Sequence, residues 1–152
     1  MKPNALVLAI LFVCVLGAVH AAAADTSPKR CGDDADDALF AVTSWSGLAR
    51  YVERFPGCDD GYFAEHMSDI VSTWLAQRPT TLAKLSRASK LHSSLMPLVV
   101  RHIDILASQR DIDLIRENAD RRCRGGSEVV CAQIIARVDE LEREAHRLRR
   151  QK

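Results

Sequence analysis

Apolar residues recur every three or four positions along most of the chain, which is the spacing of one buried face of an α-helix. No stretch after residue 33 alternates apolar and polar residues over the length of a strand. The pattern predicts an all-α fold: one bundle of five or six helices with short loops, filling residues 34–136. The first helix is predicted to run from Asp34 to Arg54, and it is weakened in its middle by polar residues and a glycine at 43, 44, 46 and 47. The other helices are predicted to begin close to Asp60, Thr81, Ser94, Ser108 and Ser127.

Polar residues stand before several of these helices and are candidates for N-caps, whose side chains accept hydrogen bonds from first-turn amides. Asp59 or Asp60 is expected to cap the second helix, where a negative charge also suits the helix dipole. Ser108 followed by Asp111 resembles a capping box, and Ser127 is expected to cap the last helix. Capping thus offers a structural role for acidic residues that could otherwise be assigned to a functional site.

The first 24 residues differ from the rest of the chain. Lys2 provides a positive start, residues 5–19 carry no charge, and residues 21–24 are small, as signal peptidases require. These features predict a cleaved signal peptide over residues 1–24, followed by a polar arm over 25–33. A retained membrane anchor is the alternative, with an apolar run near the lower limit for a bilayer span. The mature protein is therefore expected in the periplasm or outside the cell.

Four cysteines remain after the signal peptide, which itself contains Cys14. An even number in an exported chain predicts two disulfides, and the spacings match no zinc knuckle. The glycine turn before the last helix favours a bridge that locks the last two helices as a hairpin. The favoured pairs are Cys123–Cys131 and, by elimination, Cys31–Cys58.

The second of these pairs conflicts with a straight helix between its cysteines. A helix from Asp34 to Arg54 would be about 30 Å long, whereas disulfide-bonded Cα atoms lie about 6 Å apart. Three solutions remain open. The helix bends near Ser46 and Gly47, the polar arm runs back along the helix, or the connectivity is crossed.

The distribution of charge argues against nucleic acid as a partner and shows a local basic segment at the C-terminus. Without Lys2, the 21 basic residues become 20, against 20 acidic residues, so a general attraction to nucleic acid is not expected. We treat residues 137–152 as a charged helical extension of the bundle. Membrane contact is expected only through its basic end, formed by Arg147, Arg149, Arg150 and Lys152.

Acidic residues and a histidine gather where the second helix begins. They are Asp59, Asp60, Glu65, His66 and Asp69. Glu65 and Asp69 share one helix face, so the group could form a carboxylate–imidazole site if another helix added an acid. The acids do not alternate as in a calcium-binding loop, and no catalytic, metal or cofactor motif occurs elsewhere. A capped and solvated helix start is the favoured interpretation.

A second candidate is the sequence RHID at residues 101–104. His102 and Asp104 are two residues apart, so on a helix they point to different sides and cannot form a local pair. His102 falls on the apolar face of its helix. We expect it to be buried and to bond a backbone carbonyl or a buried acid such as Asp69.

The sequences GCDDG at 57–61, SD at 68–69 and RHID at 101–104, with the two C-terminal cysteines, resemble a family of small exported helical proteins of proteobacteria. The resemblance covers residues 31–135. It implies no known activity, and it implies that the matching residues act as a unit.

Several functions are compatible with these features. The leading hypothesis is an exported, non-enzymatic binding protein that recognises a protein partner in the cell envelope, such as a toxin or an envelope enzyme. One alternative is a small metal-dependent or acid–base hydrolase that uses Asp60, Glu65, His66 and Asp69. Another is an envelope structural or stress protein that acts through the basic tail. A pocket that gathered the acidic cluster around His102 would favour the enzyme.

Overall fold

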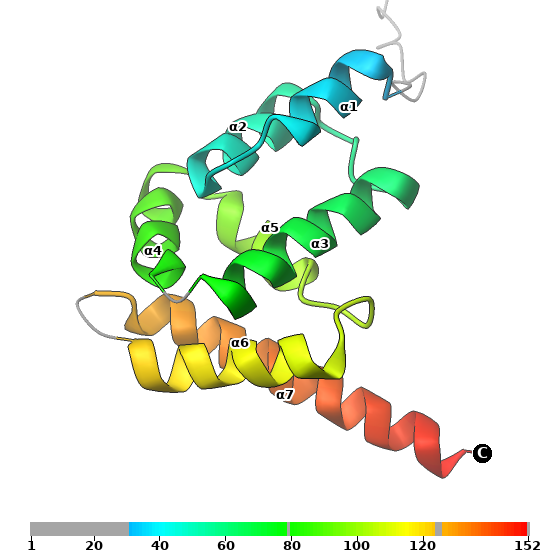
Figure 1. Cartoon of the computed structure of the whole chain (residues 1–152), viewed down its shortest axis with the longest axis vertical. Helices are drawn as coiled ribbons and strands as arrows, with labels where there is room; N and C mark the ends of the chain where they lie inside the picture. The colour runs from blue at the N-terminus through cyan, green and yellow to red at the C-terminus, as the bar shows by residue number, and fades with distance from the viewer. Residues whose placement is uncertain (1–30, 79, 124–125, 152) are drawn as a thin grey trace, which may run out of the picture.

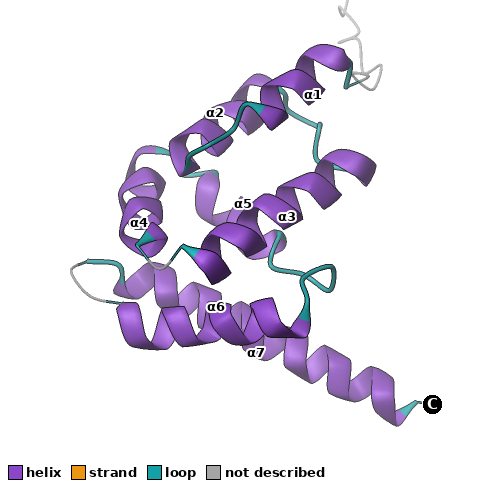
Figure 2. Cartoon of the chain, in the orientation of Figure 1, coloured by secondary structure: helices purple, strands orange, loops and turns teal. Residues whose placement is uncertain are grey.

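The computed structural model describes residues 31–78, 80–123 and 126–151, and this part of the chain is folded into seven helices without a strand (Figures 1 and 2). The helices are α1 (Asp33–Phe40), α2 (Trp45–Arg54), α3 (Gly61–Gln77), α4 (Thr81–Leu91), α5 (Leu95–Arg101), α6 (Gln109–Arg122) and α7 (Glu128–Arg150). Figure 1 shows α3 between the α1–α2 pair on one side and the α6–α7 pair on the other. The predicted all-α bundle is confirmed, with seven helices in place of five or six. The predicted signal peptide, including Cys14, lies outside the described residues.

The additional helix arises because the predicted first helix is two helices. The chain leaves α1 after Phe40 and starts α2 at Trp45. Ser44 is the N-cap of α2, and its hydroxyl accepts a hydrogen bond from the Gly47 amide at 3.1 Å. The prediction of one helix from Asp34 to Arg54 was therefore wrong, because a local cap outweighs the continuing apolar stripe.

The break also resolves the conflict over the first disulfide. Since α2 runs back beside α1, the end of α2 returns towards the start of α1 (Figure 1). Cys31 and Cys58 are disulfide-bonded, with Cα atoms 5.6 Å apart. Of the three solutions left open by the sequence, a bend is the one found, and it lies at residues 41–44, just before Ser46 and Gly47.

Helix α3 is the central element of the core. Its residues Met67 and Val71 are fully buried, and it packs most extensively against α6. The buried amide of Asn118 on α6 donates to the carbonyl oxygens of Leu75 and Ala76, each at 2.8 Å. These bonds satisfy carbonyls at the end of α3 that have no partner within the helix. Apolar burial and end-capping together hold α3 in place.

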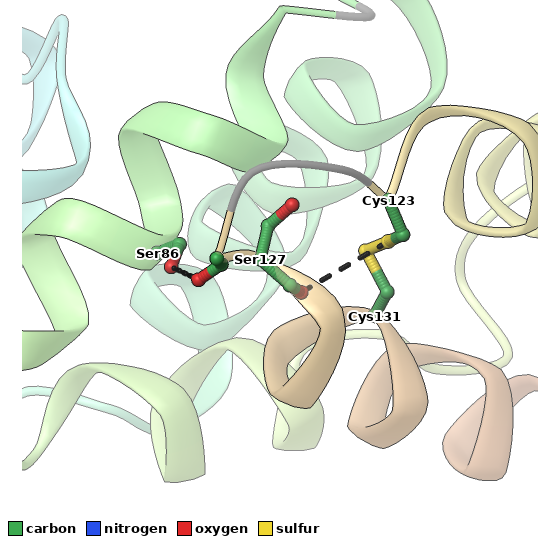
Figure 3. Close-up of a disulfide and its surroundings, with 5 residues drawn as sticks. Ser86, Cys123, Ser127 and Cys131 are labelled. Atoms are coloured by element: carbon green, nitrogen blue, oxygen red, sulfur yellow. Dashed lines mark hydrogen bonds between the residues drawn. A yellow bond between two sulfur atoms is a disulfide. The ribbon is translucent and has the colours of Figure 1, made fainter.

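The second disulfide closes the α6–α7 hairpin as predicted (Figure 3). Cys123 and Cys131 are bonded, with Cα atoms 6.1 Å apart. Ser86 on α4 donates a hydrogen bond to the Gly126 carbonyl at 2.7 Å, which fastens the turn to the rest of the bundle. Gly126 has a φ of +90°, a conformation that side-chain-bearing residues rarely adopt. Residues 124 and 125 lie outside the described part.

Of the N-caps predicted from the sequence, the one at α6 is confirmed, and those at α7 and α3 lack the expected side-chain hydrogen bond. Ser108 caps α6 as expected: its hydroxyl accepts from the Asp111 amide at 3.1 Å and donates to the Asp111 carboxylate at 2.6 Å. Ser127 occupies the N-cap position of α7 without a side-chain cap bond. Asp60 holds the same position at α3, also without a side-chain cap bond. The capping role predicted for the Asp59–Asp60 pair is therefore wrong.

Helix α7 begins in the core and ends outside it. Val138 and Leu141 are buried, whereas Leu148 is 61% exposed. Figure 1 shows the last turns of α7 projecting past the other helices. The packed part of the chain thus extends to Leu141, beyond the boundary predicted at residue 136. No helix of the described residues has the length and apolar character needed to span a bilayer.

Candidate functional site

Three of the predicted site residues, from two distant parts of the sequence, meet in a polar network at the junction of α3 and α5. Asp59 lies in the segment before α3, His102 is the C-cap of α5, and Asp104 lies in the following loop. Ser68 on the buried face of α3 joins them. We call Asp59, His102, Ser68 and Asp104 the His102 network.

The network is a continuous chain of short hydrogen bonds. His102 Nε2 lies 2.7 Å from Asp59 Oδ1, and His102 Nδ1 lies 2.9 Å from Ser68 Oγ. Ser68 Oγ then lies 2.7 Å from Asp104 Oδ2. The expectation that His102 is buried is confirmed, at 3% exposure, but its acidic partner is Asp59 and not Asp69.

Proton counting assigns the direction of each bond. Ser68 has one hydroxyl proton, and an ionised Asp104 can only accept, so Ser68 donates to Asp104. Ser68 must then accept from His102 Nδ1, while Asp59 accepts from His102 Nε2. Each ring nitrogen therefore faces an oxygen: Ser68 Oγ at Nδ1 and Asp59 Oδ1 at Nε2.

Two further contacts complete the site. Arg101 forms an ion pair with the second carboxylate oxygen of Asp59. Asp59 therefore contacts both the buried ring of His102 and the exposed guanidinium of Arg101. From α7, Arg137 Nε donates to the Ile103 carbonyl at 2.9 Å. The end of α5 is thus bound to the segment before α3, to α3 itself and to α7.

The order Ser68, His102, Asp59 is similar to that of a serine hydrolase triad, but its chemistry differs. A nucleophilic serine gives its proton to the histidine. Here the hydroxyl of Ser68 donates to Asp104 at 2.7 Å, so its proton is directed away from His102. Ser68 is also 2% exposed. The arrangement suits a structural connection between elements, not attack on a substrate.

The network continues into an exposed loop. Asp104 Oδ1 accepts a hydrogen bond from the Leu106 amide at 2.8 Å, which forms a tight turn at the loop tip. The loop presents two adjacent apolar side chains, because Ile105 is 82% exposed and Leu106 is 60% exposed. A chain of bonds therefore runs from buried His102 to the backbone beneath these two residues.

The remaining predicted site residues do not join the network. Glu65 and Asp69 lie exposed on the outer face of α3. His66 lies beside them, with its ring 4.7 Å from the Phe40 ring and 6.3 Å from the Tyr62 ring between centroids. Within the described residues, no three His, Cys, Asp or Glu side chains are arranged to hold a metal ion. The predicted carboxylate–imidazole cluster is thus divided between the network and the surface.

Two concavities border the site. A cavity of about 620 Å³ opens between α2 and α5, and Asp59, Asp60 and Arg101 contribute to its lining. A groove of about 370 Å³ lies along α3, where Glu65, Asp69 and Leu106 line it. The groove places the outer face of α3 beside the apolar loop.

Sequence reasoning gave Ser68 a place only in the motifs that carry the family resemblance, and it assigned no site role to Ile105 and Leu106. A signal existed for Ser68: it follows Met67 and precedes Val71 by three residues, so it lies on the apolar face of its helix. A serine in that position needs a buried partner. No sequence signal indicated that Leu106 would be exposed, because it continued the apolar spacing of the preceding helix.

Comparison with known proteins adds no further assignment: the chain matches no family model, no curated protein and no solved structure. The resemblance to a proteobacterial family therefore stays a prediction. Function has to be inferred from the geometry of the site itself.

Proposed function

We propose that the chain is an exported, non-enzymatic binding protein of the cell envelope that recognises a protein partner, in the manner of an inhibitor or immunity protein. The observation that carries the proposal is the loop at Ile105 and Leu106. Both side chains are mostly exposed, and the His102 network fastens the backbone below them.

This combination favours a binding role on physical grounds. Isolated exposed apolar residues are common on soluble proteins. Two adjacent exposed apolar residues on a loop that is fixed at its base are less common. Loops on rigid scaffolds are frequent binding elements, so a binding role is a natural explanation for this loop. A loop already held in one conformation loses little entropy when a partner binds, which improves affinity.

The location is supported separately. The sequence predicts a signal peptide over residues 1–24, and the two disulfides are of a kind that persists in oxidising compartments. An envelope partner follows from that location.

The hydrolase alternative has less support, because Glu65, His66 and Asp69 lie on an outer helix face, apart from the His102 network. The alternative of a structural protein acting through its tail makes a different prediction. Partner capture would then depend on Arg147, Arg149 and Arg150.

The test is comparative capture from an envelope extract by the oxidised mature protein. We expect at least one protein to be captured by the wild type and lost with the double variant Ile105→Ser, Leu106→Ser. The matched control is Leu91→Ser, Val129→Ser, which removes two apolar side chains that are 79% and 73% exposed elsewhere. Equal capture by all three proteins, or loss only on replacing the tail arginines, would contradict the proposal.

A further inference from the structure

The outer face of α3 extends the apolar loop into a larger surface. Tyr62, Glu65 and Asp69 are spaced by three and four residues, so they lie on one side of the helix. Asp69 lies seven positions after Tyr62, a distance of about 10 Å along the helix axis. Glu65 and Asp69 share the groove with Leu106 and with Asp111 at the start of α6.

Each end of this stretch carries exposed apolar side chains. At one end Phe40 is 58% exposed and Tyr62 is 51% exposed, and both rings contact the ring of His66. At the other end are Ile105 and Leu106 of the loop. We call Phe40, Tyr62, Glu65, Asp69, Leu106 and Asp111 the α3 surface. It has an apolar group at each end and carboxylates between them.

Charge distinguishes this surface from the rest of the protein. Among the described residues that line the groove along α3, three are acidic, Glu65, Asp69 and Asp111, and none is basic, in a mature chain that is close to neutral overall. Among the described residues, no ion pair neutralises Glu65 or Asp69. Desolvation and the carboxylate of Asp36 raise the pKa of Tyr62, so a further acidic residue lies beside the aromatic end of the surface.

We propose that the α3 surface binds a cationic protein segment in which Arg or Lys residues are flanked by apolar side chains. This inference rests on the proposed binding function and names the chemistry of the partner. The apolar ends provide desolvated anchors, which supply most of the affinity in protein interfaces. The carboxylates between them accelerate encounter with a positive partner and disfavour neutral or acidic ones.

The same features distinguish a protein segment from other cations and from anionic ligands. A free polyamine has the charge and lacks the aromatic and aliphatic groups that would cover Phe40, Tyr62 and Leu106. Nucleic acid and anionic lipid carry phosphates, which carboxylates repel. A segment with apolar residues about two helical turns apart, and basic residues between them, spans both ends of the surface.

The test uses a phage-displayed library of random peptides selected on the oxidised mature protein. We expect selected peptides to be enriched in Arg and Lys beside apolar residues. Their affinity should fall at least tenfold with Glu65→Lys, Asp69→Lys. Affinity should change less than twofold with Glu117→Lys, Asp120→Lys, which makes the same change in net charge on exposed positions of α6. Raising the salt concentration should also weaken binding.

Selection of peptides without basic enrichment, selection of no peptide, or equal loss with both charge-reversed proteins would overturn the inference. The proposed function is judged separately. Non-basic peptides that bind the wild type and are lost with Ile105→Ser, Leu106→Ser would refute the cationic partner while leaving the loop as a binding element.

Discussion

Asp59 Oδ1 lies 2.7 Å from His102 Nε2, so an acid at the start of one helix is paired with the histidine that ends another. The two residues are 43 positions apart in the chain. The neighbouring Asp60 is exposed and makes no side-chain cap bond. Adjacent aspartates in one sequence motif therefore have different roles.

This difference predicts unequal effects of two equivalent substitutions. Asp59→Asn removes the negative charge that faces His102 and Arg101, and should lower the free energy of unfolding by about 2–3 kcal/mol. Asp60→Asn should change it by less than about 0.5 kcal/mol, since exposed polar positions contribute little. Urea unfolding of the oxidised proteins measures both values. Equal effects would show that the Asp59–His102 pair does not hold the two helices together.

The end of α7 offers a second prediction. Truncation after Glu142 keeps buried Leu141 and the 3.0 Å ion pair of Glu142 with Arg116, so stability should fall by less than about 1 kcal/mol. Truncation after Val138 removes Leu141 and should cost about 2–4 kcal/mol through lost burial. Thermal melting of both proteins tests the boundary. A large loss of stability in the protein truncated after Glu142 would mean that exposed residues such as Leu148 support the core.

A buried tyrosine predicts a loss of stability in alkaline solution. Desolvation of its phenol, with the nearby carboxylates of Asp36 and Asp59, raises the pKa of Tyr51 from its ordinary value of 10.0 to about 12. Above pH 10 the unfolded chain releases this proton while the folded protein retains it. The contribution to stability therefore decreases as the pH rises from 10 towards 12.

At pH 11 this linkage should lower the free energy of unfolding by about 1 kcal/mol relative to pH 8. The free energy of unfolding of the Tyr51→Phe protein should not show this decrease of about 1 kcal/mol between pH 8 and pH 11. Its stability near neutral pH should be close to that of the wild type, because the Tyr51 hydroxyl is buried and unbonded within the described structure. Urea unfolding of both proteins at the two pH values provides the comparison. Parallel losses in the two proteins would exclude Tyr51 as the source.

The features that sequence predicts well here are local. Helix periodicity, the Ser108–Asp111 cap and the Cys123–Cys131 hairpin each depend on residues close together in the chain. The break before Trp45 was missed because the apolar spacing through Val42 and Trp45 continues across it. Thr43 and Ser44 carried the opposing signal, and the Ser44 cap prevailed.

The site could be predicted only in part, because its contacts are tertiary. His102 was expected to be buried beside an acid, yet periodicity cannot say which end of α3 meets the end of α5. That packing selects Asp59 over Asp69. It also determines that Leu106 leaves the helix and becomes exposed, since α5 ends at Arg101 and Asp104 forms a turn with the Leu106 amide.

The central claim is that the His102 network fixes the loop that carries Ile105 and Leu106. The most direct measurement is the hydrogen-exchange rate of the Leu106 amide, which donates to Asp104 Oδ1 at 2.8 Å. Asp104→Ala removes this acceptor and should accelerate exchange at least tenfold, whereas Asp104→Asn keeps an acceptor and should stay within threefold of the wild type. The amide of Ile134 in α7 should exchange at the same rate in all three proteins, as an internal control. An unchanged Leu106 rate with Asp104→Ala would contradict the account.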